Sequence, residues 1–310
     1  MLINRSKHSI AGLMTTRGSF TPKQVGRALG VSEASVKRWC DRGLIAAERT
    51  GGGHRRILLA SVIRFLRQEG RPLVSADVLG LPAGAGDSDR LVLRGGSEMF
   101  AALESGDEDR AHRAALNLYL GGRSVTQICD EELASSFHRL GVGWEHGETE
   151  VYQERRACEI CHHLLYGFRG FLPSVSPDAP LALGGTLSDD PYALATAMVE
   201  VCLRENGWMA ESYGTGLPGE TFAAAIRHRR PRLVWLSVSS IASEAAFLRQ
   251  YETVVEAVEE LGVALVVGGR ALDDALRREM SYATFCQTFA HVVAFATSFL
   301  PSSSGRVSEA

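Results

Sequence analysis

The chain has 310 residues, of which 45% are hydrophobic and 22% are charged, and its formal net charge is −3. No apolar run reaches the roughly 18 residues that a membrane-spanning helix needs, and the N-terminal stretch lacks the apolar core of a signal peptide. The six cysteines are scattered rather than arranged as a disulfide framework. We therefore expect a cytoplasmic protein of several domains with no membrane partner.

The charge is unevenly distributed along the chain. Residues 1–71 contain 14 Lys and Arg against 4 Asp and Glu, a net charge of +10, so the remaining residues carry −13. A basic segment joined to an acidic remainder is typical of a protein whose first part binds a polyanion.

Two short helices are predicted within the basic segment. Thr21 is an N-cap and Pro22 a first-turn proline, and Gly30 ends the helix that they begin. Ser32 caps a second helix, which ends at Gly43. Two helices joined by a tight turn with glycine form a helix-turn-helix, whose second helix enters the major groove of DNA. The residues of this helix that we expect to contact DNA are Ser35, Lys37 and Arg38.

The stretch "ERTGGGHRRI" after the second helix has three consecutive glycines flanked by basic residues. It predicts a hairpin, called the wing below, whose tip lies along the phosphate backbone. Its candidate DNA contacts are His54, Arg55 and Arg56. The elements "VGRALGVSEASVKRWCDRGLI" and "GGGHRRI", in this order and at this spacing, resemble the MerR family of winged-helix regulators. The resemblance implies a DNA-binding domain over residues 18–71 and a double-stranded DNA operator as its partner.

The middle of the chain has helical periodicity. Residues 72–94 are rich in Pro, Gly, Ala and Asp and are predicted to be a linker. Four helical segments follow, at roughly 96–105, 107–121, 124–141 and 148–168. Because the connections between them are short, we expect an antiparallel four-helix bundle over residues 95–170.

The last of these segments contains Cys158, Cys161 and His162, which leave three interpretations open. The CxxCH pattern is that of covalent haem attachment, which requires an exported protein. The i, i+3, i+4 spacing would also place three metal ligands on one helix face. The third interpretation, buried thiols beside surface histidines on an amphipathic helix, needs no ligand, and on it we predict no metal site.

After a Pro- and Ser-rich hinge, the pattern changes to alternating strands and helices. Strands are predicted at 181–187, 209–214, 232–239, 263–269 and 292–298. Helices are predicted between them, around 191–206, 219–228, 242–261 and 271–280. Continuous apolar strands that alternate with helices form a parallel sheet covered on both faces. We therefore predict a doubly wound, flavodoxin-like α/β domain over residues 180–300, with a ligand site outside the carboxyl ends of the strands.

The residues at these strand ends resemble the motifs of cobalamin-binding domains in corrinoid enzymes and sensors: D/E-x-H-x-x-G, then S-x-L or a variant, then G-G. The resemblance implies a histidine that ligates cobalt, an acidic residue that orients it, and small residues that leave room for the nucleotide tail. The first motif here keeps Asp190 but has Tyr192 for histidine and Ala195 for glycine. The other two motifs correspond to Ser237, Ser239, Gly268 and Gly269. Because a neutral phenol is a poor donor, histidine-ligated cobalamin is not expected.

The order of the three domains resembles that of the light-responsive, cobalamin-dependent repressors of carotenoid genes. In those proteins the bundle covers the upper corrin face with a tryptophan and, after nine intervening residues, a Glu-His pair. Here Trp144 is followed after nine residues by Glu154 and Arg155. The residue directly after the tryptophan, a histidine in light-dependent members, is Glu145. Both cobalt-facing histidines are therefore missing.

We predict a DNA-binding transcriptional regulator, a repressor by resemblance, with no catalytic residues. It is expected to be a homo-oligomer, because one recognition helix makes too few contacts for specificity. Its C-terminal scaffold would then act through oligomerisation, a regulatory protein partner or a different ligand.

Two alternative functions stay open for the C-terminal region. In the first alternative, the pocket would bind another tetrapyrrole, haem or a linear bilin, or would bind cobalamin in a non-standard way, as in a photoreceptor-like sensor. Arg155 would then pair with a propionate, and Tyr192 would be a metal ligand. The other alternative, an enzyme such as a corrinoid methyl carrier, needs the cobalt ligand that this chain lacks.

Overall fold

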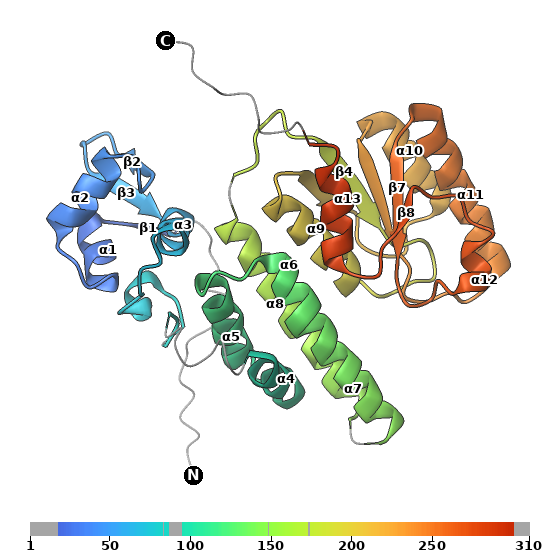
Figure 1. The fold of residues 1–310 in the computed structure, drawn as a ribbon, viewed down its shortest axis with the longest axis horizontal. Coiled ribbons are helices and arrows are strands. Elements are labelled where there is room, and N and C mark those ends of the chain that lie inside the picture. Colours follow the sequence, from blue (N-terminus) through green and yellow to red (C-terminus); the bar gives the residue numbers. More distant parts are fainter. Residues whose placement is uncertain (1–17, 83, 87–94, 148, 173, 301–310) are drawn as a thin grey trace. The chain divides into compact units, whose positions relative to one another are not determined.

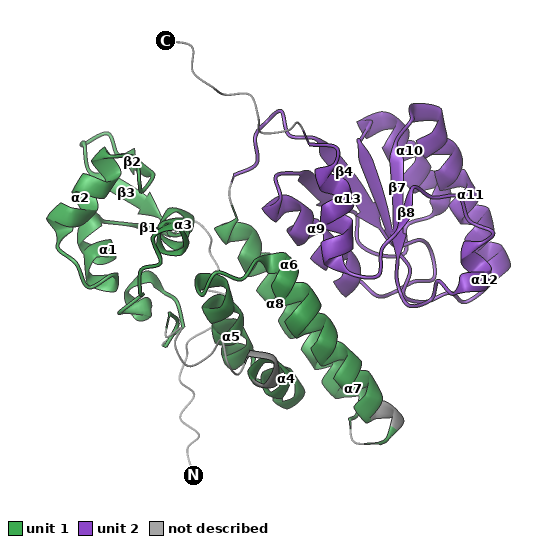
Figure 2. Ribbon diagram, viewed as in Figure 1, with its two compact units in different colours: residues 1–173 green, residues 174–310 purple. Residues whose placement is uncertain are grey.

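The computed structural model describes residues 18–82, 84–86, 95–147, 149–172 and 174–300, apart from the side chains of residues 95–97, 144 and 145. The chain divides into two compact units, residues 1–173 and 174–310 (Figure 2). Every helix among the described residues is too short or too polar to span a bilayer.

The first unit begins with three helices and a three-stranded antiparallel sheet of order β1-β3-β2 (Figure 1). Its elements are β1 (Ser19–Phe20), α1 (Pro22–Ala28), α2 (Glu33–Asp41), β2 (Ala47–Arg49), β3 (Arg55–Leu58) and α3 (Leu59–Glu69). Both predicted caps are confirmed. The Thr21 side chain accepts a hydrogen bond from the backbone of Gln24, and the Ser32 side chain accepts one from Ser35. Helices α1 and α2 with the β2–β3 hairpin form the predicted winged helix-turn-helix.

The segment predicted as a linker, residues 72–94, is described in part. It contains the short 3-10 helix η2 (Ala76–Leu79), and Leu73 is buried. The amide of Val74 donates to the carbonyl of Ala28 at the end of α1 (2.8 Å). The first part of this segment is therefore packed against the winged helix-turn-helix, while residues 83 and 87–94 lie outside the described residues.

A helical bundle completes the first unit. Its elements are α4 (Gly95–Ser105), α5 (Glu108–Leu120), α6 (Val125–Gln127), η4 (Ile128–Ala134), α7 (Ser135–Glu145) and α8 (Val151–Phe171). The third predicted helix corresponds to α6, η4 and α7, which follow one another directly, and η4 is a π-helix. The side chains between these helices are apolar, for example Met99, Leu103, Ile128, Leu133 and Ile160, all fully buried.

Arg67 joins α3 to this bundle. Its guanidinium donates to the carbonyl oxygen of Tyr119 in the last turn of α5 and to that of Arg123 in the loop after α5, and it lies 3.7 Å from the centroid of the Tyr119 ring. The C-terminal end of a helix carries partial negative charge, which favours a cation there. Arg67 therefore ties α3 directly to the bundle.

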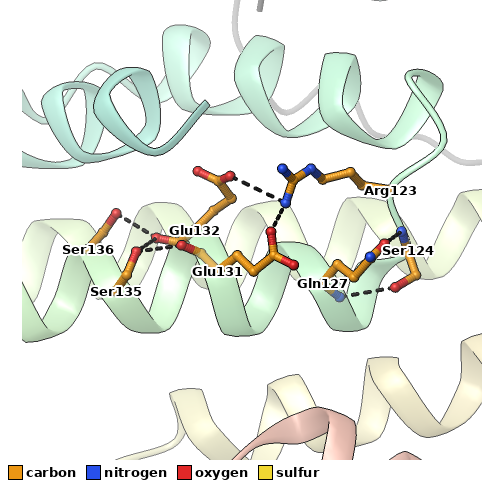
Figure 3. Close-up of polar contacts among 7 residues, drawn as sticks. All are labelled: Arg123, Ser124, Gln127, Glu131, Glu132, Ser135 and Ser136. Atoms are coloured by element: carbon orange, nitrogen blue, oxygen red, sulfur yellow. Dashed lines mark hydrogen bonds and ion pairs between the residues drawn. The ribbon is translucent and has the colours of Figure 1, made fainter. Parts of the chain in front are cut away.

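The π-helical segment holds a buried carboxyl group near Arg123 (Figure 3). The Arg123 side chain pairs with Glu131 and lies 3.9 Å from Glu132. Glu132 is 4% exposed, and its Oε2 has no hydrogen-bond partner among the described residues. Burial raises the pKa of Glu132 despite the opposing charge of Arg123. This is an energetically costly position that the surrounding helices enforce.

The second unit is a five-stranded parallel sheet of order β5-β4-β6-β7-β8 with helices on both faces (Figure 1). Its elements are β4 (Leu181–Gly185), α9 (Leu194–Glu205), β5 (Met209–Ser212), α10 (Gly219–Arg229), β6 (Leu233–Ser237), α11 (Glu244–Leu261), β7 (Ala264–Gly268), α12 (Asp274–Arg277), β8 (Thr284–Phe285) and α13 (Phe289–Thr297). The predicted doubly wound, flavodoxin-like fold is confirmed. Trp208, Trp235 and Val292 belong to the core on the α9 and α13 face, and Phe222 and Val254 to the core on the opposite face.

The predicted last strand, residues 292–298, was wrong: these residues lie in and just after helix α13. The fifth strand is β8, a few residues earlier. The Thr288 side chain accepts a hydrogen bond from the amide of His291 (3.1 Å) and so caps α13. Val292 and Ala296, one helical turn apart, are the buried residues of this helix. A short apolar run does not by itself distinguish a buried strand from a buried helix.

Gly184 on β4 is required by its neighbour on β6. A Cβ atom at this position would overlap with the indole of Trp235, which is buried. We expect Gly184→Ala to lower the free energy of unfolding by roughly 1–3 kcal/mol, because overpacking forces the ring or the strands to move. Gly141→Ala is the control: nothing lies within 4 Å of its added Cβ, and alanine favours the helix. Denaturant unfolding followed by circular dichroism measures both, and an unchanged midpoint for Gly184→Ala would contradict the close packing.

Candidate nucleic-acid interface and ligand pocket

Helix α2 presents the predicted DNA contacts on its exposed side. Lys37 and Arg38 are exposed and Ser35 is half-buried, while Val36 between them is fully buried. Arg38 donates to the hydroxyl of Ser35 (3.2 Å), and Lys37 pairs with Glu33 (2.7 Å). Because Val36 anchors the helix in the core, the neighbouring polar side chains point away from it. Exposed basic and hydroxyl groups at the start of a second helix suit contacts to bases and phosphates.

The basic residues of the wing differ in exposure. His54 and Arg56 are exposed. Arg55 instead forms an ion pair with Asp41 at the end of α2, and only 21% of its side chain is exposed. This arrangement follows from the strand alternation, because Arg55 shares a face with the buried Ile57 and Arg56 lies on the other face. Arg55 therefore holds the wing against α2, while Arg56 and His54 are the exposed basic side chains of the wing.

One basic residue of the wing was missed in the sequence. Arg49 on β2 lies opposite Arg55 in the strand register and is exposed. The sequence could have indicated Arg49, because it is a cation at the start of the glycine-rich turn. Arg49 extends the positive charge of the wing to its first strand.

Asp190 has a different role from the one that the resemblance implied. It is 3% exposed, and its two carboxylate oxygens accept hydrogen bonds from the amides of Tyr192 (3.1 Å) and Ser239 (2.6 Å). The hydroxyl of Thr186 donates to the Asp190 carbonyl oxygen (2.8 Å). Charged hydrogen bonds of this kind are strong. Asp190 therefore ties the loop after β4 to the loop after β6, and its carboxylate is engaged by backbone.

Tyr192 occupies the position at which the resemblance implied a histidine. Its ring is half-buried, and the guanidinium of Arg270 lies 5.1 Å from the ring centroid. Arg270 also donates to the carbonyl oxygen of Ser239 (3.2 Å). Among the described residues, no group of three or more His, Cys, Asp or Glu side chains is placed to hold a metal ion. A phenol beside a cation is an unfavourable donor for a metal centre.

A cavity of about 130 Å³ opens at the carboxyl ends of β6, β7 and β8, between α9 and α13. Four predicted pocket residues line it, Ala195, Ser237, Gly268 and Gly269. Tyr192 and Ser239 are not part of its lining. The residues that the sequence did not indicate are mainly apolar, among them Trp235, Val266, Cys286, Phe289 and Val292.

The two glycines at the end of β7 are required by the backbone around them. A Cβ atom at Gly268 would lie 2.6 Å from the carbonyl oxygen of Cys286, and one at Gly269 would overlap with the carbonyl of Val238. Gly269 also has φ of 127°, which side chains disfavour. Close approach of neighbouring strands thus explains both glycines without a ligand.

The residues at this site do not fit histidine-ligated cobalamin. Its nucleotide tail consists of a base, a ribose and a phosphate, and pockets for ligands of drug size measure about 300–1,000 Å³. The cavity is much smaller, and its lining contains no Lys, Arg or His to pair with a phosphate. The loop that would supply the cobalt ligand supplies Tyr192 instead.

The predicted cap residues lie in the first unit. Glu154 is half-buried and Arg155 is exposed, both on α8. Trp144 belongs to α7, and its side chain lies outside the described residues. The other candidate pocket residues all lie in the second unit.

The two cysteines on α8 differ in exposure: Cys158 is half-buried and Cys161 is buried. Burial raises the pKa of Cys158 to about 11 and the pKa of Cys161 further, so both thiols are protonated at neutral pH. His163 on the same helix contacts Glu108 of α5 (2.7 Å), which also accepts from Arg156 (3.0 Å). Burial alone would raise the pKa of Glu108, but these two partners leave it below its usual value. Through Glu108, His163 and Arg156 therefore join α8 to α5.

Comparisons with known proteins concern the helix-turn-helix domain and the fold of the rest of the chain. A family model described as a helix-turn-helix domain matches residues 19–70. The monomethylamine corrinoid protein of Methanosarcina barkeri is similar in structure, with 16% identity and a TM-score of 0.56 over 67% of this chain and 99% of that one. At this identity the likeness shows the fold alone.

Two other solved structures match less well. A methanol:cobalamin methyltransferase complex from Methanosarcina barkeri has 15% identity and a TM-score of 0.36, covering 70% of this chain and 84% of that one. A cobalamin-binding protein from Desulfitobacterium hafniense has 14% identity and a TM-score of 0.36, covering 65% and 97%. No curated protein matches the chain.

Replacing Arg56 by alanine should weaken binding to all DNA sequences by a similar factor. One lost phosphate contact lowers the slope of log affinity against log salt by about 0.9. Arg249→Ala, which removes an exposed arginine from α11, is the matched control and should leave the slope unchanged. Fluorescence anisotropy with labelled duplexes over a range of salt concentrations measures both, and equal slopes for the two variants would exclude Arg56 from the interface.

The stability of the bundle should fall as the pH is lowered past about 6.5, the pKa of an unperturbed histidine. His112 is 7% exposed, its Nε2 has no hydrogen-bond partner among the described residues, and burial lowers its pKa. The His112 imidazole is therefore protonated at a higher pH in the unfolded chain than in the folded chain. The free energy of unfolding falls as the pH drops below the pKa of the unfolded state. Denaturant titrations between pH 7.5 and about 5 should show a shallower loss for His112→Gln. His138→Gln, at an exposed position, should keep the full loss; identical curves for wild type and His112→Gln would contradict the assignment.

Proposed function

We propose that this protein is a transcriptional regulator of the MerR type that binds operator DNA and acts as a repressor rather than as an enzyme. The observation that carries the proposal is the helix-turn-helix match over residues 19–70, where α2 and the wing present exposed basic side chains. These lie on a segment with a net charge of +10, whereas the rest of the chain is acidic. The acidic remainder would be repelled by DNA, which confines binding to the first domain.

The contacts of Arg67 support a route by which the bundle influences DNA binding. Helix α3 packs behind α2, where the Phe65 ring lies 4.7 Å from that of Trp39, and its Arg67 binds the end of α5. A shift of α5 would thus move the support of the recognition helix. We also propose that the protein acts as a homo-oligomer in the cytoplasm, because paired recognition helices are needed to specify an operator.

We propose further that the C-terminal domain works without histidine-ligated cobalamin. Three observations support this: Tyr192 beside Arg270, Asp190 bound to backbone amides, and the small uncharged cavity. Haem and linear bilins carry carboxylates, and the cavity lining offers no cation to pair with them.

DNA selected from a random pool by the full chain should contain a repeated half-site. Arg38→Ala should lose the preference for that site over scrambled DNA by roughly tenfold, if the side chain contacts a base with 1–3 kcal/mol of discrimination. Arg249→Ala is again the control. Failure to enrich any sequence, at a salt concentration where non-specific binding is weak, would overturn the proposed regulator.

Adenosylcobalamin added in the dark should not co-elute with the protein in gel filtration. The absorbance of the protein peak between 350 and 600 nm is the measurement, with the wavelength range set roughly by corrin absorption. A cobalamin-binding domain that retains the histidine is the positive control. A corrin spectrum in the protein peak would contradict the cobalamin independence but not the DNA binding.

A further inference from the structure

A chain of hydrogen bonds holds the Trp235 indole beneath the cavity. Trp235 is 1% exposed, and its Nε1 donates to the hydroxyl of Thr196 on α9 (2.9 Å). Thr196 in turn contacts the hydroxyl of Ser212 (3.1 Å), whose oxygen accepts from the amide of Gly214 (3.2 Å). The only polar atom of the indole is therefore satisfied, and the ring cannot turn without breaking this chain of hydrogen bonds. The cavity has a preformed aromatic wall.

The lining excludes a charged occupant. None of the residues around the cavity is Asp, Glu, Lys, Arg or His. Cys286 is the lining residue with a titratable side chain, and burial raises the pKa of its thiol, which keeps it neutral. A charged group placed here would lose its hydration without a counter-charge. The occupant is therefore uncharged.

Ser237 supplies one polar group. Residues at alternate positions of a strand share a face, so Ser237 lies on the same face of β6 as Leu233 and Trp235, toward α9 and α13. The residue as a whole is 5% exposed, but its hydroxyl oxygen is not one of the fully buried side-chain atoms that lack a hydrogen-bond partner. The hydroxyl is therefore accessible from the cavity that it lines and can bind one polar atom of an occupant.

The cavity has room for one ring and is open to solvent on one side. An apolar cavity of about 150 Å³ in another protein binds benzene, and this cavity measures about 130 Å³. Ala195, in the first turn of α9, has the smallest side chain that a non-glycine residue can place at the lining. Aromatic walls from Trp235 and Phe289 favour a flat ring.

We propose that this cavity binds an uncharged, single-ring aromatic molecule with one hydrogen-bonding group, of which phenol is the simplest example. The polar group bonds to Ser237, and the ring lies between Trp235 and Phe289. This deepens the proposed function, on which it rests for the role of the molecule as an effector of DNA binding. The binding itself does not require DNA.

Titration calorimetry of the full chain, without DNA, tests the site with three probes that share one ring. Phenol should bind. Benzene, which lacks the hydroxyl, should bind about fivefold more weakly, the equivalent of one hydrogen bond of roughly 1 kcal/mol. Benzoate should not bind, because its charge has no partner in the lining. Equal affinity for phenol and benzoate would overturn the proposal.

Three variants identify the cavity as the site. Ala195→Leu fills it and should weaken phenol binding by at least about tenfold, as expected when a close-packed side chain occupies the space of a ligand. Ser237→Ala should reduce phenol affinity to that of benzene and leave benzene unaffected. Ala224→Leu, on the exposed side of α10, is the matched control and should bind phenol as the wild type does. Circular dichroism confirms that each variant is folded.

The outcomes separate this proposal from the proposed function. Absence of phenol binding, or binding that Ala195→Leu leaves unchanged, overturns the cavity proposal, and operator binding by the same preparation is unaffected. Cobalamin binding that Ala195→Leu abolishes would also overturn it, because the cavity would then hold part of a larger ligand. Phenol binding by a protein that fails to select any DNA sequence would overturn the regulator and keep the site.

Discussion

The packing of Trp235 across Gly184 is the constraint on which the second unit depends. The indole occupies the space that a side chain on β4 would take, and Thr196 on α9 holds its nitrogen. Strand β4, strand β6 and helix α9 are thereby fixed at one point in the middle of the sheet. The same ring lines the cavity at the strand ends, so its packing across Gly184 also sets one wall of that cavity.

At these strand ends, several residues of the motif that resembles cobalamin-binding domains are required by the fold itself. Asp190 remains, but its carboxylate bonds to the amides of Tyr192 and Ser239 and so stabilises the loops themselves. Gly268 and Gly269 remain because the neighbouring carbonyls leave no room for a side chain. Each of these residues is required by the fold, and their presence therefore does not identify the ligand.

In the first unit, side chains of one type also have different roles. Arg55, Arg56 and Arg67 are all cations of one small domain. Arg55 pairs with Asp41, Arg56 is exposed, and Arg67 donates to a carbonyl oxygen just after α5. The exposed cation suits the DNA backbone, while the other two hold the wing and the bundle in place. The domain that binds DNA is thus connected to the domain behind it by the same type of side chain that it presents to its partner.

The sequence by itself determined the helix-turn-helix, its caps at Thr21 and Ser32, the bundle, and the alternating α/β pattern, because these depend on local periodicity and capping groups. It also located Ala195, Ser237, Gly268 and Gly269 at one edge of the sheet. It did not determine that residues 292–298 are largely helical, since the apolar run fits either state and only the packing of α13 against α9 decides. Tertiary structure alone decided the partner of Asp190, the pairing of Arg55 and the size of the cavity, because each depends on side chains that are distant in the chain.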